Sequence, residues 1–177
     1  MHIEILVEDS SGEKLLQVLL PQFLGPQGEP HTWRLHAYRG IGRIPQGLVT
    51  NADPAKRILL AQLPKLLRGY GKTPGIDAVV VVLDADKRDC AAFLAELIAA
   101  KNACNPSPNT LFRLAIEEME AWYFGDQDAL LAAYPSAKCS ESMFRIAYAI
   151  RGNISPMRCI LADQPRSRKQ AGHCLGR

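Results

Sequence analysis

The sequence predicts an α/β protein with a mainly parallel four-stranded sheet flanked by helices, in a Rossmann-like arrangement. Strand-like and helix-like segments alternate along the first 135 residues, which is typical of a parallel sheet covered by helices. One strand-like segment, "AVVVVL" at 78–83, is apolar throughout. Such a run indicates burial on both faces, in the middle of a parallel sheet.

The first elements follow in order from the N-terminus. "IEILVE" at 3–8 is apolar and β-branched, as in a short strand. "SSGEKLLQVLLPQFLG" carries leucines at helical spacing and ends in glycine, which predicts a helix with Ser10 or Ser11 as its N-cap. "TWRLHAY" at 32–38 alternates and predicts the second strand, and the glycine-rich loop "RGIGRIP" follows it.

The second half of the pattern repeats this alternation. Residues 54–71 have a helical pattern in which Pro64 predicts a bend or a restart. "DAVVVVLDAD" is the clearest strand in the chain, and an amphipathic helix is expected at 90–104. "TLFRLAI" at 110–116 predicts the fourth strand, and one or two further helices are expected at 117–135.

The α/β domain is expected to span residues 1–139, followed by a basic segment at 140–177. The first part contains 14 Lys and Arg against 16 Asp and Glu, whereas the second contains 7 against 2. "SMFRIAYAI" in the second part predicts a helix, and the rest has no regular pattern and is expected to be poorly ordered. A basic tail can hold nucleic acid or can be a solvated chain end, and its charge leaves both interpretations open.

The chain is expected to be cytoplasmic and to have no membrane partner. No apolar run approaches the roughly 20 residues that span a bilayer, and the N-terminus lacks the basic start of a signal peptide. The five cysteines are scattered, which predicts reduced thiols. Cys159, His173 and Cys174 could share a zinc ion, although structural zinc sites usually have closely paired ligands.

Acidic residues follow three of the four predicted strands. Glu8 and Asp9 end the first, Asp84 and Asp86 end the third, and "EEME" at 117–120 follows the fourth. Ligands of parallel α/β sheets bind outside the carboxyl ends of the strands, so these acids are expected near one edge. In an extended chain, the side chains of Asp84 and Asp86 would point the same way, with their Cα atoms about 7 Å apart.

Such a group of carboxylates predicts a magnesium site. Clustered carboxylates repel one another, and Mg²⁺ takes oxygen ligands, often from only one or two carboxylates with water and substrate phosphate. A second ion would give the two-metal arrangement used in phosphodiester displacement. Two alternatives remain. Aspartates at strand ends are common turn formers, and a receiver-type phosphorylation domain also gathers acids there, although it needs a lysine that no predicted strand end supplies.

Basic residues lie in two loops that are expected at the same edge. Arg39 and Arg43 flank the glycines of "RGIGRIP", and Lys87 and Arg88 follow the aspartates of the third strand. Arginines and exposed backbone N–H groups can hold a nucleic-acid backbone. The alternative is a pair of solvated surface loops.

Three segments together, "ILVEDSSGEKLL", "VVVVLDADKRD" and "LAIEEMEAWYFGD", resemble the DUF4276 family of bacterial proteins, which have a TOPRIM-like fold. The resemblance covers about residues 1–135. TOPRIM proteins include topoisomerases, bacterial primases and nucleases of the overcoming-lysogenization-defect type. The resemblance implies a glutamate after the first strand, here Glu8, paired with a DxD motif after the third, here Asp84 and Asp86.

The resemblance also implies roles for these residues. The aspartate pair would bind Mg²⁺ or Mn²⁺, Glu8 would be a metal ligand or general acid/base, and Glu13 or Glu120 would complete a second metal site. The implied activity is that of a nuclease subunit that cleaves DNA phosphodiesters. Family members are often encoded beside an ATPase, so an AAA/ABC-type ATPase partner and a role in phage defence are also implied.

Two departures from the family pattern favour an alternative function. Asp9 stands where the family usually has a glycine after the first glutamate, and the C-terminal region is short and unpatterned compared with that of the family. The alternative is a non-catalytic TOPRIM-fold module that binds an ATPase partner or nucleic acid. A primase or topoisomerase would need domains that this chain lacks. The sequence leaves open whether the substrate is DNA or RNA and whether the protein forms a homodimer.

Overall fold

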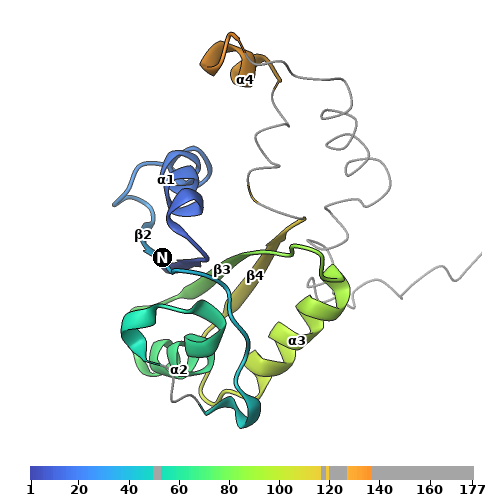
Figure 1. Ribbon diagram of the computed structural model, residues 1–177. Coiled ribbons are helices and arrows are strands. Elements are labelled where there is room, and N and C mark those ends of the chain that lie inside the picture. Colours follow the sequence, from blue (N-terminus) through green and yellow to red (C-terminus); the bar gives the residue numbers. More distant parts are fainter. Residues whose placement is uncertain (50–52, 117–118, 120–126, 137–177) are drawn as a thin grey trace, which may run out of the picture.

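The computed structural model describes residues 1–49, 53–116, 119 and 127–136 of the 177-residue chain (Figure 1). Its sheet has four parallel strands in the order β2-β1-β3-β4. The strands are β1 (His2–Val7), β2 (Thr32–Ala37), β3 (Ala78–Asp84) and β4 (Thr110–Ala115). The predicted fold class, a four-stranded parallel sheet flanked by helices in a Rossmann-like arrangement, is confirmed.

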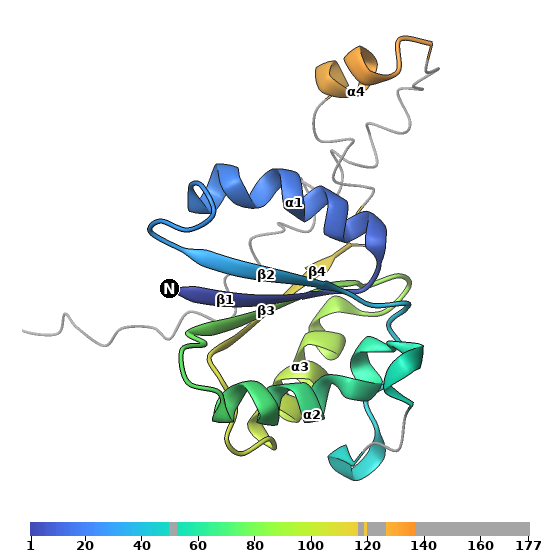
Figure 2. The ribbon, with the colours of Figure 1, turned by 90° about the vertical axis from the view of Figure 1, so that its left-hand side faces the viewer.

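Helices cover both faces of this sheet, as Figure 2 shows. α1 (Ser10–Leu24) lies on one face, and α2 (Leu59–Lys72) and α3 (Cys90–Asn102) lie on the other. Right-handed crossovers explain this division, because the chain moves one way from β1 to β2 and the opposite way from β2 to β3 and β4. The remaining elements are the 3₁₀ turns η1 (Gln46–Leu48) and η2 (Pro54–Lys56), and α4 (Gln127–Ala133).

Two apolar layers hold the helices to the sheet. Val79, Val81 and Leu83 of β3 are fully buried in the layer beneath α2 and α3. Val82 belongs to the other layer, together with Leu16 of α1. β3 therefore has apolar contacts on both faces, as its unbroken run of valines predicts, and the pairing with β1 and β4 places it inside the sheet.

Two predicted helix starts differ from the structure. The N-cap of α1 is Asp9 and not a serine: its Oδ1 accepts a hydrogen bond from the N–H of Gly12 at 2.8 Å. α2 begins at Leu59 rather than at residue 54, because Arg57 adopts a left-handed conformation (φ +52°) that ends the preceding 3₁₀ turn. α2 then continues through Pro64 as one helix, without the predicted restart.

Several predictions fall outside the described residues. These are the proposed domain boundary at 139, the helix and basic segment beyond it, the residues of the zinc hypothesis, and helical structure at 120–126. Cys104, one of the described cysteines, is a free thiol. Within the described part of the chain, no helix is long and apolar enough to cross a membrane.

Candidate functional site

The carboxyl ends of β1 and β3 bring two predicted acids together. The two strands are neighbours, with Val7 opposite Val82, so Glu8 leaves the sheet beside the end of β3. Its carboxylate oxygen Oε2 accepts a hydrogen bond from the backbone N–H of Asp84, at 3.3 Å. The expectation that strand ends far apart in the sequence meet at one edge is confirmed for this pair.

Asp84, the last residue of β3, holds a further segment to the same edge. Its Oδ1 accepts a hydrogen bond from the backbone N–H of Met119 at 3.0 Å. Met119 is itself buried against the start of α1, since a Cβ added to Gly12 would lie 2.9 Å from its Sδ. The chain beyond β4 therefore returns to the edge where Glu8 and Asp84 meet.

Asp86 does not continue the extended strand as predicted. Its φ of +49° is in the left-handed region, and its side chain is exposed, whereas Ala85 before it is buried. The expected parallel orientation of Asp84 and Asp86 rested on an extended backbone and does not apply to this turn. Asp86 is still close enough to influence Glu8 electrostatically.

The environment of Glu8 disfavours its negative charge. Partial burial raises the pKa of Glu8 above its ordinary value, and the hydrogen bond from the Asp84 N–H opposes this. The negative charges of Asp86 and Asp9 raise the pKa further, and the charge of Arg88 lowers it. A cation at this edge would relieve the same repulsion, because it favours the ionised carboxylates.

Asp9, the N-cap of α1, directly follows Glu8, and Glu13 lies in the first turn of the helix. Both carboxylate oxygens of Asp9 accept from the Ser11 hydroxyl, at 3.1 and 3.0 Å, in addition to the cap bond to Gly12. Asp9 therefore has a structural role in starting the helix. Glu13 is partly exposed, and the structure shows no contact that joins it to Glu8.

The metal hypothesis can be tested against these donors. Across residues 1–49, 53–116, 119 and 127–136, no three His, Cys, Asp or Glu side chains are grouped closely enough to hold an ion together. Glu120 lies outside the described residues. Glu8 and Asp84 still supply the hard oxygen donors that Mg²⁺ takes, and Mg²⁺ commonly needs only one or two carboxylates with water and phosphate. This acid pair fits such an ion.

The predicted basic residues lie on loops around this edge. The loop after β2 is tied to it by a hydrogen bond from the Gly40 N–H to the carbonyl of Glu8, at 3.2 Å. Arg39 and Arg43 on this loop are exposed. In the turn after β3, Lys87 and Arg88 are exposed, and the Arg88 guanidinium lies 4.5 Å from the centre of the Phe93 ring.

Sequence analysis missed a second polar cluster inside the sheet. Glu4 of β1 is almost fully buried, and its two oxygens lie 3.2 Å from His2 Nε2 and 2.5 Å from His36 Nε2. His2 Nδ1 is 2.8 Å from the hydroxyl of Thr32. Two features of the sequence could have indicated this cluster. Glu4 is a charged residue within an otherwise apolar strand, and the alternation of β2 places His36 on the same face of the sheet as Glu4.

The fold and this edge define a class: Rossmann-like α/β proteins with carboxylates at the carboxyl ends of two central parallel strands. The chain belongs to the family described as domain of unknown function (DUF4276), whose model matches residues 7–156. That span includes Glu8, Asp84 and Asp86 and extends beyond residue 139. Comparisons with curated proteins and with solved structures gave no match.

Proposed function

We propose that this protein is a TOPRIM-like, Mg²⁺-dependent nuclease subunit that cleaves DNA phosphodiesters. The observation that carries the proposal is the meeting of Glu8 and Asp84 at the carboxyl ends of β1 and β3, within the electrostatic reach of Asp86. Parallel α/β sheets bind their ligands at this edge. Glu8, Asp84 and Asp86 are the residues that would hold Mg²⁺ or Mn²⁺, with Glu13 or Glu120 as candidates for a second site.

The divalent ion, when bound, supplies Lewis-acid stabilisation of the phosphate and an acidified water. Glu8 takes the proton of the attacking water as general base, or ligates the ion. Its raised pKa makes its carboxylate a stronger proton acceptor than an ordinary glutamate. The water oxygen bonds to phosphorus, and the departing sugar oxygen leaves with the electrons of the broken P–O bond and takes a proton from solvent.

The basic loops would position the nucleic acid. Arg39, Arg43, Lys87 and Arg88 are exposed on the two loops that border the acidic edge, where they can contact backbone phosphates. Such contacts fix the register of the scissile phosphate and carry no sequence preference. A partner ATPase of the AAA/ABC type, which the family resemblance implies, would control access to DNA in a phage-defence system.

Nicking of a supercoiled plasmid in the presence of Mg²⁺ or Mn²⁺, with and without a candidate partner ATPase, tests this proposal. We expect nicking by the wild type and a loss of at least about 10²-fold in Asp86→Asn, because the variant loses a carboxylate that would hold the metal ion, and the ion is what stabilises the charge of the transition state. Glu96→Gln, an exposed carboxylate change on α3, is the control and should nick as the wild type does. Equal nicking by all three proteins would contradict the proposal.

A second candidate is a non-catalytic module that binds an ATPase or nucleic acid through the same fold. It is favoured by the use of Asp9 as a helix cap and of one Asp84 oxygen to hold Met119, which leaves fewer oxygens for a metal. This candidate predicts that Asp86→Asn binds the ATPase or DNA as tightly as the wild type while neither protein nicks DNA.

A further inference from the structure

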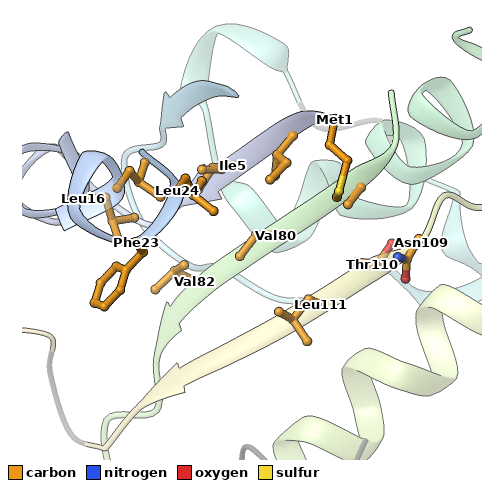
Figure 3. A pocket seen from close by; sticks show the side chains of 13 residues that line it. Met1, Ile5, Leu16, Phe23, Leu24, Val80, Val82, Asn109, Thr110 and Leu111 are labelled. Carbon is orange, nitrogen blue, oxygen red and sulfur yellow. The ribbon is translucent and has the colours of Figure 1, made fainter. Parts of the chain in front are cut away.

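The hollows in the described part of the chain differ in the ligands that they can select. The hollow beside α1 is lined by aliphatic side chains such as Leu16, Val80 and Leu111, and no charged side chain of the described residues lines it (Figure 3). Two hollows beside α2 are different, because Arg57 lines one of them and Lys65 the other. Cationic side chains select anions, so these two hollows are candidates for a ligand site.

The two hollows beside α2 adjoin each other. The first has a volume of about 450 Å³ and lies between the end of β2 and η2, where His36 and Arg57 line it. The second has a volume of about 400 Å³ and runs along α2, where Lys65 lines it. Pro54 and Gln62 line both hollows, so one ligand can extend from the first into the second. Each volume is within the range of roughly 300–1,000 Å³ that is usual for small-molecule sites.

Arg57 is held in place by its backbone and by its side chain. Its N–H donates to the carbonyl of Pro54 at 3.1 Å, and its carbonyl accepts from the N–H of Arg39 at 2.8 Å. Its guanidinium donates to the carbonyl of Ala37 and lies 5.8 Å from the centre of the Tyr38 ring. Its left-handed backbone (φ +52°) is rare for a residue other than glycine, and such strain is concentrated at functional sites. A guanidinium has five N–H groups, so Arg57 keeps donors for an anion.

Acidic side chains of the described residues do not line either hollow, and the carboxylates nearby have partners. The two oxygens of the buried Glu4 contact Nε2 of His2 and Nε2 of His36. Asp53, at the start of η2, accepts from the N–H of Ala55 at 2.9 Å. Since Glu4 occupies Nε2 of His36, Nδ1 is the ring nitrogen that remains for a ligand in the first hollow.

The second hollow has an apolar and aromatic part. Leu66 and Tyr70 line it, and Gly69 leaves open space beside them, since a Cβ added there would meet no atom within 4 Å. Flat ring systems stack on aromatic side chains. Among the described residues, Arg57 and Lys65 are the arginine and lysine side chains that line the two hollows, whereas a nucleic-acid strand is held by a longer series of basic contacts. The arrangement therefore fits a small anion joined to a ring.

We propose that the joined hollows beside α2 bind a small phosphorylated molecule with a flat ring system, of the chemical class of a nucleoside monophosphate. Arg57 binds the phosphate oxygens through its guanidinium. Gln62, which lines both hollows, contacts the ligand between its two parts, and Lys65 adds a second positive charge. The ring lies against Leu66 and Tyr70. This site is separate from the carboxylates at the ends of β1 and β3, and the proposal does not rest on nuclease activity.

Isothermal titration calorimetry of the full-length chain with adenosine monophosphate, in buffer free of divalent ions, tests this site. We expect the wild type to bind and Arg57→Gln to have a Kd at least about 10-fold higher, because charge-assisted hydrogen bonds to the phosphate are lost. Lys65→Gln, on the exposed side of α2, should also weaken binding, and it provides a second test if Arg57→Gln does not fold. Lys56→Gln is the matched control, since Lys56 is exposed, precedes Arg57 and lines neither hollow.

Inorganic phosphate and adenosine, titrated separately, should each bind at least about 10-fold more weakly than adenosine monophosphate, because each occupies one hollow and the linked molecule occupies both. No binding of adenosine monophosphate by the wild type, or equal affinity in Arg57→Gln, Lys65→Gln and Lys56→Gln, would overturn the proposal. Binding that is lost in Arg43→Gln would also overturn it and assign the anion to the loops around Glu8 and Asp84. Tighter, Arg57-dependent binding of a single-stranded oligonucleotide would overturn it and assign the hollows to nucleic acid.

Discussion

Substitution of the buried Glu4 tests how much the hydrogen bonds of its carboxylate stabilise the folded protein. The Glu4 side chain is 5% exposed, and each neighbouring histidine side chain is 29% exposed. A carboxylate can only accept hydrogen bonds, so His2 and His36 must each donate through Nε2 to Glu4. Glu4→Gln keeps the shape of the side chain but replaces one accepting oxygen with an amide that donates.

The variant therefore loses one hydrogen bond to a charged group, which contributes about 1.5–3 kcal/mol. Both histidine side chains are partly exposed, so water can replace part of the lost hydrogen bond and limits the cost. We expect the free energy of unfolding to fall by about 2 kcal/mol. For a chain of this size, that corresponds to a decrease in Tm of about 4–8 °C.

Urea unfolding followed by circular dichroism measures this change directly. Glu96→Gln on the exposed face of α3 is the control, and its free energy of unfolding should stay within about 0.5 kcal/mol of the wild type. A double-mutant cycle with His36→Gln should give a coupling energy of about 1 kcal/mol or more, since the two side chains touch. A Glu4→Gln variant as stable as the control would refute the reasoning.

Three further changes test other parts of the structure. The raised pKa of Glu8 means that the folded state holds its proton more tightly, so stability falls as pH rises from the ordinary value of 4.5 through the raised one. Glu8→Gln should therefore have a higher Tm than the wild type at pH 7.5 and the same Tm near pH 4; a lower Tm at pH 7.5 would contradict this. Gly12→Ala should destabilise by about 1–3 kcal/mol in urea unfolding, because its Cβ would lie 2.6 Å from a methyl of Val7. Gly69→Ala in α2 meets no atom within 4 Å and should stabilise by about 0.5–1 kcal/mol; equal effects of the two glycine changes would exclude the packing argument. Asp89→Ala removes the bond from Asp89 Oδ1 to the first turn of α3 and should lower the free energy of unfolding by about 1 kcal/mol, whereas Asp89→Asn should retain most of it.

The sequence predicted the strands well because their signal is local. The unbroken valines of β3 can be satisfied only by burial on both faces, and the structure places this strand between β1 and β4. Helix starts were less predictable. Asp9 and Ser10 are both good N-caps by residue type, and the structure uses Asp9, whose Oδ1 accepts a hydrogen bond from the N–H of Gly12.

The candidate site was predictable only in part. Strand order alone brings Glu8 beside Asp84, so the topology predicts that contact. The left-handed turn at Asp86 could not be foreseen, because non-glycine residues rarely adopt that conformation. The Glu4 cluster needed the β1–β2 register, which joins residues 32 positions apart, and no short motif encodes it.

The most direct test of the central claim is divalent-metal binding by isothermal titration calorimetry. Mn²⁺ or Mg²⁺ is titrated into the wild type, into the double variant Asp84→Asn, Asp86→Asn, and into the Glu96→Gln control, each with and without a short oligonucleotide. The account predicts binding by the wild type and the control and none by the double variant. Absence of binding by the wild type even with the oligonucleotide, or equal binding by the double variant, would contradict a metal site at the end of β3.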